Sequence, residues 1–565
     1  MMGLHKLNIV NRKQLPLLIY LVYISLILLI TVTFCLNSYW SYTAPQDGMW
    51  NLPTASLLRG SSIYQNYMSP LWHIEFLNWN IPIVSSPYGG AGKSYLLAFT
   101  SLFFPTFAIA NLTLNFILLF FVIFLTYCVS VQISGRTLAF ISTLILLFSN
   151  GFMFAAQTDY GPILIGTSCL LLIALLYLKR EHLEPDRYVY IMSFLIGGSL
   201  ADKLTIFPYL LPTAIYLIIF LFKTRFKNRF KVIFLCFISF LIPLTFHLLY
   251  FLSGGWSELL AWLGPAGPAN NSGQIGLLQT WNALITFSDV GFGGENPYLY
   301  RAFFHVTNAL PSQTSLLICA IIILTAPIFS LARVLLSGRS LNKIDLLYFY
   351  PLIVLTITPI FSYNPWHLLP LTPFVIILGI HFISNNLSLP AIIIRYLHLG
   401  RLKFNFSLAL GSIFVILIGA SSFDYYANFK NVNAVGIASL DTKLIGPKLV
   451  AAKIKQITCL DYSVCLNVTA NMPQNQFEIV DDYTFDANFA RSGLTQLIKI
   501  SSCEATVLTR SYLKTTGFFS NQLVQGNSSI FSTENFPEKL QLTQIASVTI
   551  DGEKLLAWRK SACTE

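Results

Sequence analysis

The chain has 565 residues, of which 55% are hydrophobic and only 10% are charged, and its formal net charge is +11. Soluble globular domains carry about 25% charged residues. A chain this poor in charge, with a mean hydropathy of +0.64, needs lipid around much of its surface. The composition therefore excludes a soluble protein and predicts an integral membrane protein. Its basic residues lie between apolar runs, which indicates membrane topology and not a nucleic-acid partner.

Long apolar runs follow one another along most of the chain. A membrane-spanning helix needs about 20 mostly apolar residues. The first run, 15–35, lacks a small-x-small cleavage site, so we predict an uncleaved span and not a signal peptide. About eleven spans are predicted by this length rule: 15–36, 112–133, 137–156, 160–178, 188–202, 204–222, 232–253, 314–335, 345–362, 365–384 and 405–421.

Lysine and arginine in the short loops give the predicted orientation, because cytoplasmic loops are enriched in both. If there are eleven spans and the N-terminus is cytoplasmic, every basic loop falls on the same side. One span more or fewer would put some of them outside. The basic positions lie in 6–13, at 136, and in 179–187, 223–231, 333–343 and 395–403.

This orientation divides the chain into two parts. Residues 1–421 form a transmembrane module with two extracytoplasmic loops, 37–111 and 254–313. Residues 422–565 alternate polar and apolar side chains and contain no span, which predicts an extracytoplasmic α/β domain. In it we expect an amphipathic helix over 441–457 and strands over 464–470, 505–510 and 545–558. Asp551-Gly552 in the last segment is a two-residue hairpin signal.

The cysteines fall into two groups. Those in or beside apolar runs are predicted to be small packing residues: Cys35, Cys128, Cys169, Cys236 and Cys319. The other four lie in the C-terminal domain: Cys459, Cys465, Cys503 and Cys563. An even number in an extracytoplasmic domain predicts two disulfides, and the short separation favours pairing Cys459 with Cys465. Four free thiols are the alternative.

Residues 89–94 (GGAGKS) look like the end of a phosphate-binding loop. The full pattern needs glycine where Pro87 stands, and the segment is predicted to lie outside, where ATP is scarce. We therefore expect a glycine-rich bend that leads into a helix, and not a nucleotide site. Lys93 is a candidate contact for a lipid phosphate at the membrane surface.

Four ionisable residues at three places near span ends are candidates for chemistry. Asp47 follows the first span and precedes stretches 52–58 and 70–76, which are suited to lie flat at the interface. A carboxylate there can accept a proton from a hydroxyl, and an ordinary solvated aspartate is the alternative. Asp159 lies between two spans, where helix capping is the alternative. Asp202 and Lys203 lie next to hydrocarbon, where ionisable groups are costly; a mutual ion pair is their alternative.

Several segments, in order over roughly 15–385, resemble one known family. They are Asp47 itself, 135–136 (GR), 159–162 (DYGP), 197–205 (GGSLADKLT), 296–301 (NPYLYR) with 310–311 (LP), and 367–373 (HLLPLTP). This order resembles the C-type glycosyltransferases, or GT-C fold, in the branch of the protein O-mannosyltransferases and the bacterial aminoarabinose transferase of lipid A. Two positions depart from that pattern. Gly48 replaces the usual acidic neighbour of Asp47, and His367 stands where arginine or tyrosine is commoner.

The resemblance implies transfer of a sugar from a polyprenyl-phosphate donor to a lipid, glycan or protein acceptor, with inversion at the anomeric carbon. Asp47 would be the general base. Lys203 would stabilise the leaving phosphate, with Lys93 and Arg301 beside it. Asp159 would bind acceptor, sugar or a divalent cation, and no other cofactor is expected. His367 completes the substrate-binding set. The resemblance also implies a bacterial inner membrane. With the orientation given by the basic loops, the N-terminus is cytoplasmic and the C-terminal domain extracytoplasmic.

Two other classes of protein stay open at this stage. A lipid-linked-sugar flippase or transporter would need polar residues deep within spans and internal repeats. Few ionisable residues lie deep in any predicted span, and the sequence has no convincing repeat. A non-catalytic membrane scaffold that uses the C-terminal domain is the third class. It would tolerate loss of Asp47 and Lys203, whereas a transferase would not.

Overall fold

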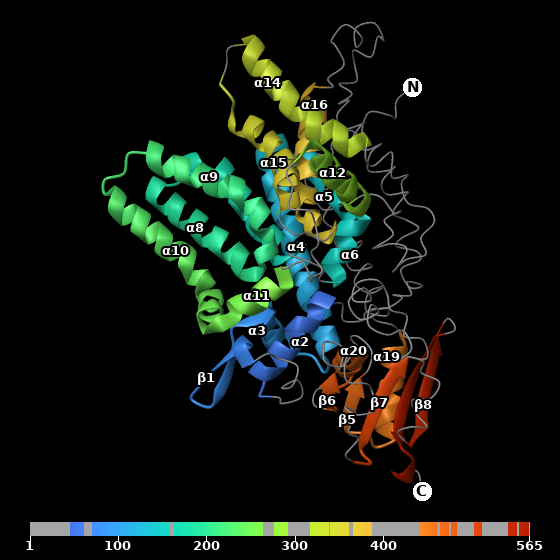
Figure 1. Ribbon diagram of the computed structural model, residues 1–565. Coiled ribbons are helices and arrows are strands. Elements are labelled where there is room, and N and C mark those ends of the chain that lie inside the picture. Colours follow the sequence, from blue (N-terminus) through green and yellow to red (C-terminus); the bar gives the residue numbers. More distant parts are fainter. Residues whose placement is uncertain are drawn as a thin grey trace, which may run out of the picture.

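Apolar helices make up most of the chain that the structure, a computed structural model, describes (Figure 1). The described residues are 46–60, 70–86, 88–158, 163–263, 276–291, 317–337, 340–360, 365–386, 440–459, 464–473, 476–482, 502–510, 541–550 and 553–563. The helices of the bundle are α4 (Phe107–Ser134), α5 (Arg136–Leu147), α6 (Asn150–Thr158), α7 (Ile165–Leu178), α8 (Pro185–Asp202), α9 (Phe207–Lys223), α10 (Arg229–Tyr250), α11 (Trp256–Leu263), α12 (Leu277–Gly291), α14 (Ala326–Ser337), α15 (Lys343–Ile357) and α16 (Thr372–Asn386).

Five helical stretches in the described ranges are long and apolar enough to cross a membrane: Phe107–Ser134, Leu204–Lys223, Arg229–Leu260, Leu317–Leu336 and His367–Ser384. Shorter apolar helices cover Arg136–Leu147 and Ile165–Leu178. Within the described residues, the predicted spans between 112 and 384 lie on helices of the bundle, with one exception. Spans 15–36 and 405–421 lie outside the described residues, so the count of eleven stays a prediction.

One predicted span is wrong as a single helix. Residues 137–156 form two helices, because α5 ends at Leu147 and α6 begins at Asn150. Between them the hydroxyl of Ser149 donates a hydrogen bond of 2.7 Å to the carbonyl of Gly291, at the end of α12. Ser149, at the junction of the two helices, thus bonds outside both of them.

Polar side chains mark where several helices begin. Thr106 precedes α4, and its hydroxyl accepts the backbone N–H of Ile109. Asn228 precedes α10 and accepts the N–H of Lys231. Asn342 precedes α15 and shares a reciprocal capping box with Asp345. Such caps satisfy backbone donors that have no partner within the helix. They therefore fix the helix starts that hydropathy alone leaves uncertain.

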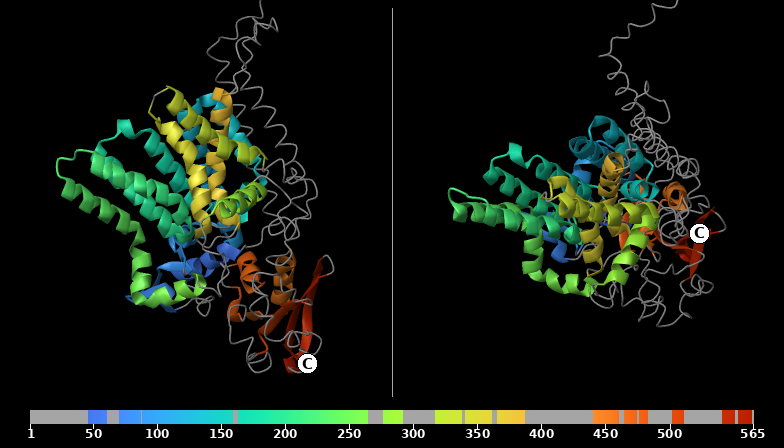
Figure 2. Two further views of the ribbon diagram at one scale, coloured as in Figure 1. Left: turned by 45° about the horizontal axis from the view of Figure 1, so that its top comes forward. Right: turned by 90° about the horizontal axis from the view of Figure 1, so that it is seen from above.

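The helices pack around one extended apolar core. It contains residues of α4, α5, α7, α15 and α16, such as Val122, Leu144, Leu171, Val354 and Val375. Helices α8, α9 and α10 stand together at one side of this group (Figures 1 and 2). Gly197 of α8 is the point where α10 comes nearest, because a Cβ there would lie 2.2 Å from the carbonyl oxygen of Phe240.

The first loop contains a helix, two small sheets and a second helix. In order these are α2 (Gln46–Leu58), η2 (Pro70–Trp72), β1 (His73–Phe76), β2 (Trp79–Pro82), β3 (Val84–Ser86), β4 (Gly89–Gly90) and α3 (Gly92–Thr100). Stretch 52–58 is helical, as its pattern predicts. Stretch 70–76 is instead a single 3-10 turn followed by a strand that pairs with β2. The pairing places the Phe76–Trp79 turn at an exposed tip.

The C-terminal part contains α19 (Leu440–Ala451), α20 (Val464–Asn471) and a five-stranded sheet in the order β6-β5-β7-β9-β8. The strands are β5 (Gln456–Cys459), β6 (Glu478–Asp482), β7 (Ala505–Arg510), β8 (Leu542–Ile550) and β9 (Glu553–Lys560). Strand β5 is parallel to β6 and β7, whereas β9 is antiparallel to β7 and β8. Ile550 pairs with Glu553, which fits the predicted two-residue hairpin at 551–552.

Two predicted elements in this part need correction. Residues 464–470 form helix α20 and not a strand. Val464, Cys465 and Val468 are all buried there, and their spacing puts them on one face of a helix. The helix predicted over 441–457 ends at Ala451, because Gln456 enters β5 at the centre of the parallel strands.

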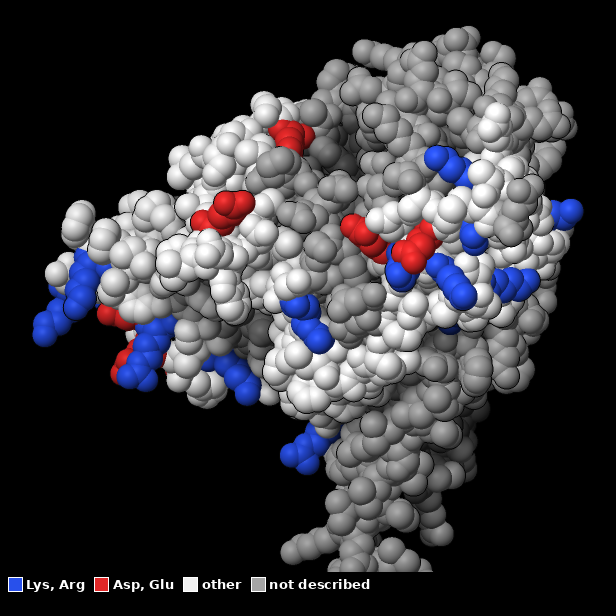
Figure 3. Space-filling view, turned by 90° about the horizontal axis from the view of Figure 1, so that it is seen from below, with Lys and Arg blue, Asp and Glu red and all other residues white. Residues whose placement is uncertain are grey.

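The C-terminal sheet packs against the first loop and the beginning of α4. Leu52 of α2, Leu97 of α3 and Ala110 of α4 share one apolar cluster with Ile445 and Val468. We call this end of the bundle the sheet end, and the other the far end. Seen from the sheet end, mixed basic and acidic side chains gather over the C-terminal part (Figure 3); Lys455 and Glu504 form an ion pair of 2.8 Å there.

A disulfide joins Cys503, just before β7, to Cys563, just after β9. Cys465 is also disulfide-bonded. The side chain of Cys459 lies outside the described residues, so its pairing with Cys465 stays a prediction. The four described cysteines of the helical part are free thiols: Cys128, Cys169, Cys236 and Cys319.

Replacing Cys503 with serine should destabilise the C-terminal sheet. The bond closes a loop with a sequence separation of 60 residues, and the loss of such a cross-link costs about 4 kcal/mol in the chain-entropy model. Trypsin should therefore cleave the C-terminal part of the Cys503→Ser protein much faster than that of the wild type. Cys128→Ser, which removes a free thiol of α4, is the control. Equal cleavage rates for all three proteins would contradict the prediction.

Candidate active site

Asp47 occupies the first turn of α2 at the sheet end; its side chain lies outside the described residues. The helix itself is fixed by polar contacts to α3. The hydroxyl of Ser94 in α3 donates a hydrogen bond of 2.9 Å to Oδ1 of Asn51 in α2. Asn51, Thr54 and Ser94 are all buried. Buried polar groups that are hydrogen-bonded to one another specify one arrangement of the elements that carry them. The backbone position of Asp47 is therefore tied to α3.

The glycine turn, which we define as residues 88–92, packs against the corner where α8 gives way to α9. Gly89 forms a β-bridge with Lys203. The backbone N–H of Leu204 donates a hydrogen bond of 2.8 Å to the carbonyl of Tyr88. On the inner side of the turn, the Ser85 hydroxyl donates a hydrogen bond of 3.1 Å to the carbonyl of Gly90. Backbone contacts thus join two segments that are more than a hundred positions apart in the sequence.

Glycine is required at position 90 by close contact. A Cβ at Gly90 would lie 1.9 Å from the carbonyl oxygen of Ala201 and 2.9 Å from Cε1 of His247. No side chain fits there without moving backbone. A Cβ at Gly92, two residues later, would have no heavy atom within 4 Å. The phosphate-loop-like pattern of 89–94 is thus explained by packing, at least for Gly90, and the expected bend into a helix is present.

Lys93 follows the glycine turn and is buried, with 5% of its surface exposed. Its ammonium donates a hydrogen bond of 2.7 Å to Oδ1 of Asn115 in α4. A buried ammonium is tolerated only when it is well hydrogen-bonded. Asn115 is also buried, between Leu114 and Phe116 of α4 and one turn after the buried Asn111. Sequence reasoning missed Asn115, and the signal that could have found it is an amide inside an apolar run.

Lys203 is the residue at which the chain leaves α8. Its φ of −148° and ψ of 127° are extended, and they separate α8 from the 3-10 turn η4 (Leu204–Ile206) that leads into α9. The side chains of Asp202 and Lys203 are half-buried. The bridge to Gly89 places Lys203 beside the same turn that precedes Lys93. Two of the cations predicted to bind a phosphate therefore flank one turn at the sheet end.

His247 of α10 is a further residue of this region that sequence reasoning missed. Only 1% of its surface is exposed, and its ring touches the turn at Gly90. Its Nε2 atom is buried and accepts or donates no hydrogen bond within the described part of the chain. A buried polar atom without a partner costs free energy. The signal available in the sequence was an ionisable side chain near the end of an apolar run.

Of the other predicted site residues, Asp159, Arg301 and His367, only His367 lies in the described part of the chain. Asp159 and Arg301 lie outside the described residues. His367 is buried in the 3-10 segment η9 (Pro365–Leu371), and its carbonyl accepts a hydrogen bond of 2.6 Å from the hydroxyl of Tyr209. Segment η9 packs against α6, the helix that ends just before Asp159. The described contacts thus form two groups, one around the glycine turn and one around η9.

The described residues include no group of three or more histidine, cysteine, aspartate or glutamate side chains that could hold a metal ion. Neither Asp47 nor Asp159 has a described side chain, so the predicted divalent cation at Asp159 stays a prediction.

The chain is similar in structure to ArnT from Cupriavidus metallidurans bound to undecaprenyl phosphate. The TM-score is 0.53 at 11% sequence identity, and the match covers 96% of this chain and 98% of that one. The apo state of the same protein gives a TM-score of 0.49, also at 11% identity and over 96% and 98% of the two chains. An apo oligosaccharyltransferase from Archaeoglobus fulgidus gives 0.41 at 12% identity, over 82% and 64%. No family model and no curated protein sequence matches.

The likeness to ArnT, a lipid A aminoarabinose transferase with a GT-C fold, confirms that the chain has a GT-C fold. It runs over nearly the whole length of both chains. Together with the apolar helices, it shows that the chain is an integral membrane protein with a GT-C fold. At 11% identity the likeness carries no residue role from one protein to the other, so the role of each side chain has to be argued from this chain.

Replacing Gly90 with alanine should destabilise the protein, because the added methyl group would overlap the Ala201 carbonyl. Overpacking of this kind costs about 1–3 kcal/mol or more. We expect a lower midpoint of thermal unfolding for purified Gly90→Ala protein in detergent. Gly92→Ala adds the same methyl group in open space and should unfold like the wild type. The close contact would be contradicted if the two variants had equal midpoints.

Proposed function

We propose that this protein is a membrane glycosyltransferase that moves a sugar from a polyprenyl-phosphate donor to an acceptor at the sheet end of its helices. The observation that carries the proposal is the pair of lysines beside the glycine turn. Lys93 and Lys203 flank this turn at the end of the apolar helices, next to the helix that contains Asp47. A phosphate that is anchored by an apolar tail in the membrane would meet cations at this depth.

The fold supports the same class of donor. The similar ArnT structure is bound to undecaprenyl phosphate, which is a polyprenyl phosphate. A donor that enters from the membrane needs an apolar path for its tail and a polar end for its phosphate. The apolar helices supply the path for the tail, and the corner at Lys203 supplies the polar end for the phosphate.

In the proposed reaction Asp47 takes the proton from the acceptor hydroxyl as the hydroxyl oxygen attacks the anomeric carbon. The bond between that carbon and the phosphate oxygen breaks, and its electron pair leaves with the polyprenyl phosphate. A single displacement inverts the anomeric centre. Base catalysis of this type contributes about 10²–10⁴-fold to the rate.

The developing charge on the leaving phosphate calls for fixed cations, and preorganised donors in a site poor in water are among the strongest catalytic contributions. Lys203 is the first candidate, because its backbone is fixed to the turn by the bridge to Gly89. Lys93 is the second, held by Asn115. Arg301 and His367 are proposed to contact substrate, and Asp159 to bind acceptor, sugar or a divalent cation.

A lipid-linked-sugar flippase is the alternative, because it would bind the same lipid. It differs in its product: a flippase leaves the sugar on its carrier, whereas a transferase releases the bare polyprenyl phosphate. The location in a bacterial inner membrane and the extracytoplasmic position of the sheet end belong to this proposal, since the basic loops of the far end support that orientation.

Replacing Asp47 with asparagine should lower the rate of transfer by about 10²–10⁴-fold, the usual contribution of a general base. Purified protein in liposomes would be given a panel of polyprenyl-phosphate sugars with labelled sugars, and release of the bare carrier would be measured. Asp186→Asn is the matched control, because Asp186 is an exposed acid in the first turn of α8. Full turnover by Asp47→Asn would refute the role of base, and transport without release would favour the flippase.

Replacing Lys203 with glutamine should lower the rate constant for the chemical step by about 10²–10³-fold, the typical loss when one stabilising donor is removed. Lys203→Arg should restore part of it, because the charge remains. Lys223→Gln is the control, since Lys223 is an exposed lysine at the other end of α9. If Lys203 only holds the corner together, Lys203→Arg and Lys203→Gln should lower the unfolding midpoint and the rate in parallel, which would argue against a direct contact with phosphate.

A further inference from the structure

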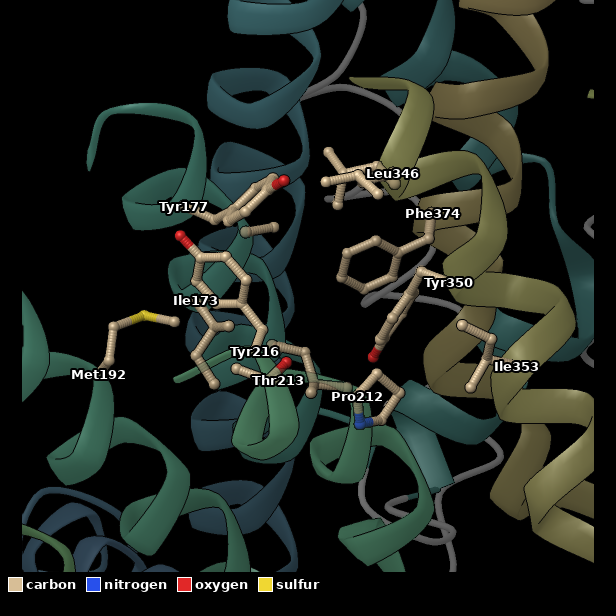
Figure 4. A pocket seen from close by; sticks show the side chains of 13 residues that line it. Ile173, Tyr177, Met192, Pro212, Thr213, Tyr216, Leu346, Tyr350, Ile353 and Phe374 are labelled. Carbon is tan, nitrogen blue, oxygen red and sulfur yellow. The ribbon is translucent and has the colours of Figure 1, made fainter. Parts of the chain in front are cut away.

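The helical part contains a cleft that the proposed reaction does not use. It lies between α7, α8 and α9 on one side and α15 and α16 on the other, and it has a volume of about 200 Å³. Figure 4 shows its two walls facing each other, with Ile173, Tyr177 and Tyr216 opposite Phe374 and Tyr350. The other lining residues are Leu170, Ala174, Met192, Pro212, Thr213, Leu346, Leu347 and Ile353.

The cleft opens on the outer surface of the helices. Two of its lining residues, Leu346 and Ile353, are 46% and 38% exposed. Nearby positions of α9 are large, apolar and exposed, such as Ile215 and Ile218. In a protein that spans a membrane, such a surface faces lipid chains. The cleft is therefore a recess that lipid can enter from the side.

Polar groups lie together at the far end of the cleft. A guanidinium N–H of Arg180 donates a hydrogen bond of 2.7 Å to the hydroxyl of Tyr216. The guanidinium also lies 5.7 Å from the ring centroid of Phe220. Tyr177 packs against Tyr216 edge to face, with ring centroids 5.1 Å apart. Tyr216 in the cleft wall is thus bonded to the Arg180 guanidinium, and Tyr177 packs beside Tyr216.

Two other basic residues, Lys343 and Lys179, lie in the same region as Arg180. Lys343, at the start of α15, forms an ion pair of 3.0 Å with Glu181, and it lowers the pKa of that carboxyl by its hydrogen bond and its charge. The same ammonium donates a hydrogen bond of 3.2 Å to the carbonyl of Leu178. Lys179 is exposed beside them. Arg180 itself bonds to a neutral hydroxyl, and guanidinium groups bind phosphate well because their donors form a planar fork.

This cluster is far from the candidate active site. Helix α8 begins at Pro185, next to Arg180, and ends at Asp202, next to the glycine turn. A helix of 18 residues is about 27 Å long at 1.5 Å per residue, which is close to the thickness of the hydrocarbon core. The cations at the end of the cleft therefore belong to the opposite face of the membrane from Lys203.

We propose that this cleft is a binding site for an anionic glycerophospholipid, with one acyl chain between α9 and α15 and the phosphate against Arg180. Basic pockets between transmembrane helices bind anionic head groups, and the cations here complement a phosphate. The volume of about 200 Å³ is below the roughly 300–1,000 Å³ of pockets that enclose drug-sized ligands. It suits part of one chain, while the rest of the lipid stays in the bilayer. The proposal does not depend on the transferase function.

The test uses full-length protein and a phosphatidylglycerol that has a photoactivatable group near the end of one acyl chain. After illumination in mixed vesicles, the labelled peptides are identified by mass spectrometry. We expect labels on the parts of α7, α9 and α15 that line the cleft, and competition by unlabelled phosphatidylglycerol but not by phosphatidylcholine. Labels spread evenly over all lipid-facing helices, including α10, would overturn the proposal. So would equal competition by the two lipids.

Two variants sharpen the test, each with a matched control. Arg180→Gln should weaken phosphatidylglycerol binding about fivefold, the effect of one basic residue near an anionic surface; Arg187→Gln, at an exposed arginine paired with Glu184, should not. Thr213→Phe should block the cleft, whereas Thr245→Phe on the exposed side of α10 should leave labelling unchanged. If polyprenyl phosphate displaces the label at lower concentration than phosphatidylglycerol does, the site belongs to a polyprenyl lipid and the proposal is wrong.

Discussion

The close contact between the glycine turn and the α8–α9 corner is the constraint on which the candidate site depends. Gly90 approaches Ala201 so closely that no side chain is possible, and Gly89 bridges to Lys203. These contacts involve backbone, which has few ways to adjust. Because α3 follows the turn directly, the contact also fixes where Lys93 lies. The positions of both lysines thus follow from one packing arrangement.

The same arrangement extends to the first loop and the C-terminal part. Helix α3 is bonded to α2 through Ser94 and Asn51, and α2 shares an apolar cluster with α19 and α20. A continuous set of packed residues therefore connects the C-terminal part to the backbone at Asp47. A structural change in the C-terminal part can thus shift the position of Asp47.

Hydropathy predicted most of the helical fold, because a membrane requires long apolar runs whose backbone polar groups are satisfied within a helix. It failed where a polar residue bonds across the structure, as Ser149 does with Gly291. The strand predicted at 464–470 is a helix because burial against α4 and β5 decides the structure of so short an apolar run. Packing of this kind joins residues distant in sequence, and local patterns do not contain it.

The candidate site was less predictable than the fold for a related reason. Lys93 attracts attention in the sequence through the phosphate-loop-like run 89–94, and Lys203 as a cation between two spans, but their common turn depends on the contact at Gly90. His247 and Asn115 were not predicted, since each lies in a helix that is apolar over most of its length. Only their contacts in the fold connect His247 to the glycine turn and Asn115 to Lys93.

A fold can persist at 11% identity because most positions of a membrane helix need only an apolar side chain of suitable size. Helix contacts add a demand for small residues at a few points, such as Gly197 against Phe240. Chemistry places a stricter demand on fewer positions, and fold alone does not satisfy it. Gly48 stands beside Asp47 where the resembling family has a second acid, so the carboxylate would have to act without that neighbour. In the proposed mechanism Asp47 therefore acts as the base alone. Lys93 and Lys203, both fixed near the same turn, supply the positive charge for the leaving phosphate.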